Sequence, residues 1–435
     1  MPSRKPARST RGKPPEVEVQ IAALGGRGDG VGYAAGQGGG QGGGQAIFVP
    51  FAVPGDRLRV AIVGERDGGL LGRIVERLED GADRARPPCR HFGTCGGCAL
   101  QHVTAEAYVA WKQALIGQAL ARRGIEAEIL PLRTLPPAGR RRAVFAAARH
   151  GKYVELGFNA SASASVVDLQ ICLILEERLV ALLAPLRETL LAVLGPKEAA
   201  DLAVALTDSG IDLWIKARRP PGLTAREALV DLANARDLAR VSAGPEAELV
   251  LMRRQPRAIF GGVAVALPPG AFLQPTAAGE AVLAETVTGA LAGRGRVADL
   301  YAGCGTFTFP LAARAKVHAV EGDEPSLAAL AGAARNLAGR VSAERRDLAR
   351  SPLTAAELDR FDAVVFDPPR AGAKDQSAEI ARSRLDLAVG VSCHPGSFAR
   401  DAQILIDGGF RLEQVLPVDQ FPWSPHLELV GIFRR

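Results

Sequence analysis

Two residues near the C-terminal end of the chain have the types and surroundings that covalent catalysis requires. Cys393 follows an apolar run, Leu387–Ser392, that is typical of a buried strand. A cysteine thiolate is a strong nucleophile, and a covalent intermediate divides one difficult reaction into easier steps. Glu428 stands in a second apolar run, where a carboxylate is costly unless it has a partner or a chemical task. We therefore expect a nucleophile at Cys393 and a proton acceptor at Glu428, with a buried core cysteine and an arginine-paired glutamate as the alternatives.

A glycine-rich turn after the strand-like run Val297–Leu300 indicates a site for a nucleotide-like ligand. A strand, a glycine turn such as the one at Gly303, and then a helix form the place where an α/β sheet approaches such a ligand. The spacing differs from G-x-G-x-x-G, so a dinucleotide is not favoured. Glu321 ends the next run, about 20 residues later, where an acid can bond ribose hydroxyls. A structural turn without a ligand is the alternative.

Two aspartates follow further strand-like runs and could face the same ligand. Asp367 ends the run Ala363–Phe366 and precedes two prolines, which stop the strand. A carboxylate at the carboxyl end of a central strand faces the ligand crevice of an α/β sheet. Asp347 lies just past the run Val341–Arg345 and could reach the same crevice. A tight turn at Asp367 and an ordinary surface position for Asp347 are the alternatives.

The elements that would carry these residues alternate between strands and helices from about Gly279 onward, within an expected domain of residues 269–435. Buried apolar strands that alternate with helices are typical of a doubly wound α/β sheet. Helices are expected over 325–338 and 397–406, and a short proline-rich connection between the last two strands indicates an antiparallel edge pair. The expected strands are 297–300, 317–320, 341–345, 363–366, 387–392, 412–418 and 427–433.

The first part of the chain has a different pattern, with short strands separated by glycine. Residues 16–77 are expected to form a small β-barrel, because short strands recur there at close spacing. A glycine turn follows the first strand, and Gln37–Gly44 is expected to be a flexible loop. Residues 1–15 are expected to be a disordered basic tail, which suits either a polyanionic partner or a purely solubilising role. The expected strands are 17–21, 46–50, 57–63 and 71–75.

Residues 78–268 carry four cysteines whose spacing is typical of a metal site. Cys89, Cys95 and Cys98 fall in one short stretch, and Cys172 is the other cysteine before residue 269. A zinc site usually brings a second C-x-x-C or a histidine pair, and neither is found near this stretch. Three close thiolates and a distant fourth suit a 4Fe–4S cluster. We favour the cluster over zinc and expect its role to be structural.

The same region is expected to mix helices and strands and to carry a basic patch. The charges cluster at 140–142 and 149–152, where Arg140, Arg141, Arg142, Arg149, His150 and Lys152 occur. Such residues contact the phosphates of a nucleic acid without reading its sequence, although charge runs are more often simply solvated. Helices are expected at 105–123 and 176–194, and strands at 144–148, 154–158, 202–207 and 213–216.

The overall composition excludes several classes of protein. With 435 residues, of which 47% are hydrophobic and 23% charged, the chain is long enough for two or three folded domains. No apolar run reaches the roughly 18 residues that a membrane span needs, and the N-terminus has no apolar region of a secretory signal. The net charge of +6 comes mostly from the tail. We expect a cytoplasmic protein that does not contact a membrane and acts as a monomer.

These motifs, taken in order, resemble those of the bacterial RNA uracil-5-methyltransferases, and the resemblance covers nearly the whole chain from Val17. It implies an S-adenosylmethionine-dependent enzyme that methylates carbon 5 of a uridine in structured RNA, with ribosomal RNA favoured over transfer RNA. It also implies a class I methyltransferase-type sheet in residues 269–435, an OB-like TRAM barrel that binds RNA, and a 4Fe–4S cluster on the four cysteines. The matching segments are Phe272–Gln274, Asp299–Phe307, Val320–Gly322, Asp367–Arg370, Ser392–Pro395 and His426–Glu428.

The resemblance further implies roles for single residues. Cys393 would form a covalent adduct with the uracil, and Glu428 would accept the carbon-5 proton. Gln274 would contact the target uracil or the cofactor. The chain departs from the family pattern at Pro275–Thr276, at Thr306 and at Leu173. The residues expected to hold S-adenosylmethionine are Gln274, Tyr301, Gly303, Thr306, Glu321, Asp347 and Asp367.

Two other classes of function remain as alternatives. Methyltransferases that act on amino groups of adenine or guanine also end the fourth strand in an acid or amide followed by two prolines. They usually place an aromatic residue next, where this chain has Arg370, and they need no cysteine. A non-catalytic RNA-binding protein of the same fold would be expected to have lost Cys393, Glu428 or the glycine turn, and all three are present.

Overall fold

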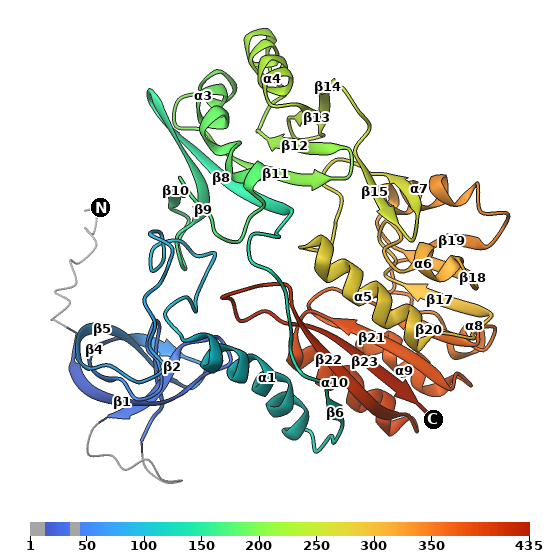
Figure 1. The fold of residues 1–435 in the computed structure, drawn as a ribbon, viewed down its shortest axis with the longest axis horizontal. Helices are drawn as coiled ribbons and strands as arrows, with labels where there is room; N and C mark the ends of the chain where they lie inside the picture. The colour runs from blue at the N-terminus through green and yellow to red at the C-terminus, as the bar shows by residue number, and fades with distance from the viewer. Residues whose placement is uncertain (1–13, 35–43) are drawn as a thin grey trace, which may run out of the picture. The chain divides into compact units, whose positions relative to one another are not determined.

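The computed structural model describes residues 14–34 and 44–435, which divide into two compact units (Figure 1). One unit contains the described residues up to Gly93, together with Cys98–Trp111 and Trp423–Pro425. The other contains Thr94–Gly97, Lys112–Pro422 and His426–Arg435. Most of the expected basic tail, residues 1–13, and most of the expected glycine-rich loop, residues 37–43, lie outside the described residues.

The first unit contains a closed five-stranded barrel in the order β1-β2-β3-β5-β4, which confirms the expected barrel. Its interior is filled by Val19, Ile21, Val49 and other apolar side chains from alternating strand positions. The expected glycine turn is wrong in part, because Gly30–Ala34 is a strand. A Cβ on Gly32 would lie 2.3 Å from the Gln20 carbonyl oxygen, so glycine allows this strand to pair closely. The strands are β1 (Glu16–Leu24), β2 (Gly30–Ala34), β3 (Ile47–Val49), β4 (Arg57–Arg66) and β5 (Gly69–Glu79).

Helix α1 (Ala105–Ala121) belongs to the first unit up to Trp111 and to the second unit from Lys112. The second unit contains a seven-stranded sheet in the order β10-β9-β8-β11-β12-β13-β14. Helices α3 (Leu183–Val193) and α4 (Leu223–Ala235) lie on one side of this sheet (Figure 1). Their leucines share one apolar core with the inward residues of the strands. The strands are β8 (Arg142–His150), β9 (Tyr153–Asn159), β10 (Val166–Asp168), β11 (Ala199–Thr207), β12 (Gly210–Lys216), β13 (Leu238–Ala243) and β14 (Glu248–Met252).

The single helix expected over 176–194 is two helices, α2 (Glu177–Val180) and α3. Pro185 lies in the first turn of α3. Proline has no N–H to bond the carbonyl one turn earlier and is tolerated only at the start of a helix. The helix therefore stops at Val180 and begins again at Leu183.

A larger sheet follows in the order β19-β18-β17-β20-β21-β23-β22-β6. The strands β19, β18, β17, β20 and β21 are neighbours in this order and run parallel to one another. Strand β23 runs antiparallel to both β21 and β22. The antiparallel final pair is confirmed, but β22 is not the edge, because the two-residue strands β6 and β7 pair with it. The strands are β6 (Glu128–Ile129), β7 (Arg133–Thr134), β17 (Arg296–Leu300), β18 (Lys316–Glu321), β19 (Val341–Arg345), β20 (Ala363–Phe366), β21 (Leu387–Ser392), β22 (Arg411–Asp419) and β23 (Glu428–Arg434).

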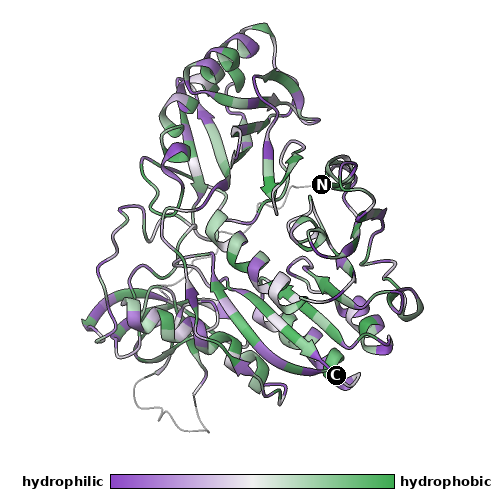
Figure 2. Ribbon diagram, turned by 45° about the vertical axis from the view of Figure 1, so that its right-hand side comes forward, coloured by the Kyte–Doolittle hydropathy of each residue, from purple (hydrophilic) through white to green (hydrophobic). Residues whose placement is uncertain are grey.

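Helices cover both faces of this larger sheet, so it is doubly wound as expected. Val365 packs in a core with Leu283 of α5, whereas its neighbour Val364 packs in another core with Leu405 of α10. Its strands are largely hydrophobic, as the green strand leading to the C-terminus shows (Figure 2). The helices are α5 (Ala277–Ala290), α6 (Thr308–Ala312), α7 (Glu324–Ala334), α8 (Ala355–Leu358), α9 (Lys374–Arg382) and α10 (Pro395–Asp407), and a separate hairpin is formed by β15 (Arg257–Phe260) and β16 (Val263–Ala266).

None of the helices in the described part of the chain combines the length and the apolar character needed to cross a membrane.

Candidate active site

The expected site residues gather where the parallel strands of the larger sheet end. Strand β17 leads into the turn at 301–305, in which Tyr301, Gly303 and Gly305 have φ angles of 63°, 55° and 103°. A Cβ on Gly303 would meet nothing within 4 Å, so this position faces open space. The left-handed backbone at Gly303 and Gly305 explains the need for glycine in this turn.

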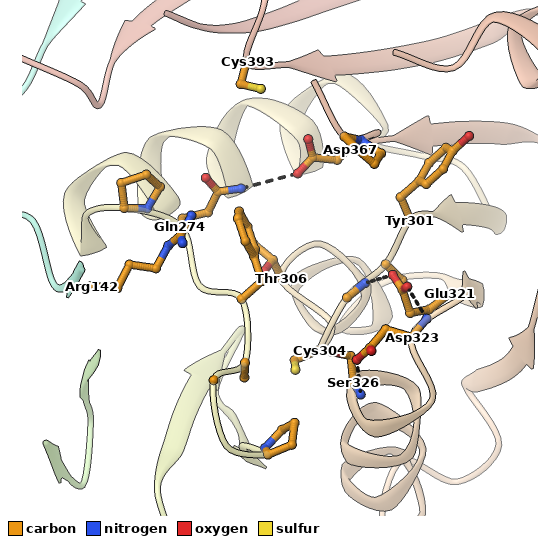
Figure 3. Close-up of a pocket in the computed structure, with 18 of the residues that line it drawn as sticks. Arg142, Gln274, Tyr301, Cys304, Thr306, Glu321, Asp323, Ser326, Asp367 and Cys393 are labelled. Atoms are coloured by element: carbon orange, nitrogen blue, oxygen red, sulfur yellow. Dashed lines mark hydrogen bonds between the residues drawn. The ribbon is translucent and has the colours of Figure 1, made fainter. Parts of the chain in front are cut away.

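Glu321, at the end of β18, holds the glycine turn in place. Its two carboxylate oxygens accept hydrogen bonds from the backbone N–H groups of Gly303, at 2.8 Å, and Asp323, at 2.7 Å. These bonds fix the direction of the carboxylate at the wall of the pocket (Figure 3). Carboxylate oxygens have further acceptor positions, so Glu321 can still bind hydroxyl groups of a ligand.

A chain of buried amides leads to Asp367, which follows β20. The Gln274 amide donates to Asp367 Oδ2 at 3.4 Å (Figure 3). Gln420 Nε2 donates to Gln274 Oε1 at 3.1 Å, and the Gln420 side chain is fully buried. Gly279 of α5 makes room for it, since a Cβ there would lie 2.1 Å from Gln420 Oε1. Gln420 therefore fixes which way the Gln274 amide points.

The antiparallel pairing of β21 and β23 brings Cys393 and Glu428 together. Ser392 pairs with Leu429, so Cys393, one residue later, and Glu428, one residue earlier, lie across from each other. Cys393 is partly buried and Glu428 is only 4% exposed. The charge of Glu428 acts on the Cys393 thiol, so the two groups are close enough to act on one ligand.

Burial changes the ionisation of these groups. Burial, aided by the charges of Glu428 and Asp367, raises the pKa of the Cys393 thiol to about 11. Burial also raises the pKa of Glu428 well above its usual range, and nearby Asp367 adds to the effect. Burial raises the pKa of Asp367 to about 7. Burial therefore favours the neutral forms of these groups, and a positively charged ligand would favour their ionised forms.

Arg142 is the cation whose charge acts on Glu428. It lines the pocket, and its guanidinium lies over the Phe272 ring at 4.3 Å. Burial lowers the pKa of Arg142 to about 10, whereas the charge of Glu428 acts in the opposite direction. Its Nε is buried with no hydrogen-bond partner among the residues the structure describes. Arg142 can therefore bind a carbonyl or phosphate oxygen of a ligand.

The expected basic patch is not one surface. Arg141 is buried, pairs with Glu280 and donates to the Gln274 carbonyl. Arg149 donates to the Leu191 carbonyl at 2.7 Å and to neighbouring carbonyls. Adjacent residues on a strand point to opposite faces, so a run of arginines is divided between core, pocket and surface.

A buried lysine, which the sequence did not single out, supports the loop before Glu428. Lys112 of α1 is fully buried, and its Nζ donates to Asp419 Oδ1 at 2.6 Å. The same Nζ donates to the Phe421 carbonyl at 3.2 Å and to the His426 carbonyl. Lys112 therefore holds both ends of the loop that carries Gln420 and leads to Glu428.

These groups line one cavity of about 750 Å³, a volume typical of sites for small ligands. Asp347 is not among its lining residues in the described structure; it is exposed and pairs with Arg350 at 3.4 Å. Sequence reasoning did not find Gln420 or the position of Arg142 in the pocket, because each depends on contacts between distant segments. The expected site residues that line the cavity are Gln274, Tyr301, Gly303, Thr306, Glu321, Asp367, Cys393 and Glu428.

The four cysteines expected to bind metal are all partly buried. Cys95 and Cys172 pack against the core of the seven-stranded sheet. In the other unit, the Cys89 backbone N–H donates to Gln101 Oε1 at 3.1 Å. Among the described residues, no three histidine, cysteine or acidic side chains form a group that could hold a metal ion. The expected metal site therefore has no support from the geometry and stays a prediction.

Comparison with known proteins adds to this geometry. Residues 265–435 match the family described as tRNA (Uracil-5-)-methyltransferase. An uncharacterized RNA methyltransferase of Caulobacter vibrioides is 43% identical over 96% of this chain and 100% of its own length. The 23S rRNA (uracil(1939)-C(5))-methyltransferase RlmD of Chromohalobacter salexigens is 36% identical over 89% of this chain and 84% of its own length. The tRNA (uracil-54, C5)-methyltransferase of Pyrococcus abyssi, solved with S-adenosyl-L-homocysteine, has a TM-score of 0.73 at 20% identity and covers 96% of this chain and 100% of that one.

Proposed function

Because the chain belongs to the family of S-adenosylmethionine-dependent RNA uracil-5-methyltransferases, we propose that it methylates carbon 5 of one uridine in structured RNA. The observation that carries this proposal is that Cys393 and Glu428, which lie at the same end of the paired strands β21 and β23, both line the cavity that also contains the glycine turn. We propose ribosomal RNA rather than transfer RNA as the substrate, because the 36% identical relative acts on 23S rRNA.

The cavity fits S-adenosylmethionine by its volume and by its donors and acceptors. We propose that Glu321 bonds the ribose, since its carboxylate is held at the wall beside the open space over Gly303. The buried Asp367 carboxyl offers negative charge to a cationic ligand. Tyr301, Gly303, Thr306 and Gln274 complete the proposed set. Asp347 is kept in this set only because it follows β19, since it does not line the cavity in the described structure.

The proposed reaction divides the work between Cys393 and Glu428. The Cys393 thiolate adds to carbon 6 of the uracil, which makes carbon 5 a nucleophile. S-adenosylmethionine, when bound, supplies the methyl group to carbon 5. Glu428 then takes the proton from carbon 5, and the electron pair of that C–H bond re-forms the double bond as the bond between sulfur and carbon 6 breaks. Cys393 leaves as the thiolate, and the enzyme is regenerated.

Mapping 5-methyluridine tests this function directly. In RNA from cells with and without the gene, one uridine of the 23S ribosomal RNA should lose its methyl group when the gene is absent. If 5-methyluridine is lost from a transfer RNA instead, the proposed reaction would stand and the proposed substrate would be wrong. No change in any 5-methyluridine would defeat the proposed function.

Replacing Glu321 should weaken S-adenosylmethionine binding. Glu321→Ala removes charge-assisted hydrogen bonds worth about 1.5–3 kcal/mol, so the Kd measured by calorimetry should rise about 10- to 150-fold. Glu321→Gln keeps the shape and should give a smaller loss. Glu324→Ala, an exposed acid on α7 outside the lining, is the matched control and should bind normally. Unchanged affinity in Glu321→Ala would remove this residue from the cofactor site.

We further propose that Cys89, Cys95, Cys98 and Cys172 hold a 4Fe–4S cluster. The support is the spacing of the cysteines and the resemblance to the ribosomal RNA branch of the family. Protein purified without oxygen should contain about four iron and four sulfide per chain, and Cys98→Ser should lose most of the iron. Stoichiometric zinc without iron would overturn the assignment.

The division of labour along the chain is part of the same proposal. Residues 16–77, which contain the closed barrel, would act as an OB-like, TRAM-type RNA-binding module. Residues 78–268 would form the central domain and residues 269–435 the methyltransferase domain.

A further inference from the structure

The seven-stranded sheet of the second unit has one packed face, and its other face is open along β8 but covered at β13, where Arg240 and Ser242 are buried. Phe145, Leu202 and Leu213 point into the core that α3 and α4 cover. Side chains alternate along a strand, so the residues between them point to the other face. Val144, on that other face, is 52% exposed. Figure 1 shows both helices on the same side of the sheet.

The open face has small side chains in its middle and aromatic side chains at its two ends. The register pairs Val144 with Ala203, and Ala203 with Trp214, so all three share this face. Ala146 and Ala148 continue it along β8, and the exposed Asp201, which pairs with Ala146, adds one acid to this face. Alanine side chains leave the sheet flat, which permits close approach of a planar base or of a backbone.

The aromatic groups stand beside positive charges. At one end, Lys216 Nζ lies 4.5 Å from the centre of the Trp214 ring. At the other end, His150 and Tyr153 pair across the β8–β9 hairpin, with ring centres 5.3 Å apart and planes at 27°. Tyr153 is 58% exposed, and the exposed Lys152 lies next to it in the hairpin. His150 also pairs with Glu155 at 3.1 Å, so the charge of this acid is partly offset by a neighbour on the same face.

The face is continuous with the active-site cavity. Arg142, the first residue of β8, and Trp214 both line that cavity. The strand from Arg142 to His150 has nine residues. At about 3.4 Å per residue it extends about 27 Å from the cavity to the aromatic pair.

We propose that this open face, from Trp214 and Arg142 to Tyr153, binds unpaired nucleotides of the RNA next to the target uridine. The inference rests on the proposed function and adds the surface that delivers the substrate. Proteins hold single-stranded RNA by stacking bases on aromatic side chains and by placing cations near the phosphates, and this face offers both at its ends. The flat alanine surface between these two ends adjoins the cavity, so the RNA strand could follow it to the pocket.

Two substitutions test the surface without touching the cavity. Val144→Glu puts a negative charge in the middle of the path, and Tyr153→Ala removes a stacking surface at its end. Leu223→Glu is the matched control, because Leu223 is 74% exposed on α4, on the packed side of the sheet. Tyr153→Trp keeps a stacking ring. Each variant is assayed for methylation of an unmodified 23S ribosomal RNA transcript, with its thermal stability and S-adenosylmethionine affinity as measures of the fold.

The expected result is a rise in KM for the transcript of about 5- to 100-fold in Val144→Glu and Tyr153→Ala, with kcat little changed, since binding is lost equally in ground and transition states. Tyr153→Trp and Leu223→Glu should match the wild type. Normal KM in both face variants, with an active wild type, would overturn the inference and leave the function standing. Normal KM on the transcript but lost methylation of ribosomal particles would assign the face to a protein and also overturn it. A wild type that methylates no RNA would defeat the function and the inference together.

Discussion

Cys393→Ala should abolish methylation while the protein still binds both S-adenosylmethionine and RNA. The substitution removes the thiol that would add to the uracil ring, so the covalent adduct cannot form. Loss of a covalent nucleophile typically costs on the order of 10⁴-fold or more in rate. The measurement is the transfer of a labelled methyl group to a 23S ribosomal RNA transcript, compared with wild type at saturating cofactor.

Cys393→Ser separates chemistry from packing. Serine has nearly the same shape, so a purely structural role of Cys393 would leave this variant active. A hydroxyl group is a far weaker nucleophile than a thiolate without an adjacent base, so we expect it to be inactive as well. Full activity in either variant would rule out the covalent mechanism.

The ionisation of Cys393 explains why the reaction should depend on bound substrates. Burial raises the pKa of this thiol to about 11, which favours the neutral thiol. Arg370 acts in the opposite direction, and Cys393 lies two residues before the N-terminus of α10, where thiolates are favoured. A cationic cofactor would act in the same direction as Arg370. A bound cofactor would therefore favour the thiolate that the reaction needs.

Much of the site could be predicted from the sequence because parallel strands end at one edge of a sheet. Gly303, Glu321, Asp367 and Cys393 each follow an apolar run, and the structure brings all four to the same cavity. Glu428 lies at the start of a strand instead of the end. It reaches the same edge because β23 is antiparallel, which the short proline-rich connection before it had indicated.

The parts that could not be predicted depend on contacts between distant segments. Gln420 meets Gln274 across 146 positions of sequence, and Lys112 meets Asp419 across 307. Strands β6 and β7 have two residues each, too few for any periodicity, and they form only because β22 offers an unpaired edge. The arginine run at 140–142 does not form one surface, because Arg141 is buried and Arg142 lines the cavity.

Glu428→Gln should stop the reaction after methyl transfer and accumulate a covalent protein–RNA species. Glutamine keeps the size of the side chain in a position that is 4% exposed, but it cannot accept a proton. Cys393 can still attack and carbon 5 can still receive the methyl group, whereas the carbon-5 proton stays in place and the cysteine cannot leave. A general base is typically worth about 10²- to 10⁴-fold, so a slow band should appear on a denaturing gel.

The raised pKa of Glu428 strengthens this expectation. Burial and Asp367 raise it, so the ionised carboxylate is a stronger base than an exposed glutamate, while nearby Arg142 favours the ionised form. A glutamine amide is not basic, so it cannot replace the carboxylate as the proton acceptor.

RNA containing 5-fluorouridine should trap the wild type in the same way, because fluorine cannot leave as a proton. Cys393→Ala/Glu428→Gln should give no slow band with either RNA, which ties the species to Cys393. Normal turnover by Glu428→Gln without a trapped species would assign the base to another residue and leave the role of Cys393 unchanged.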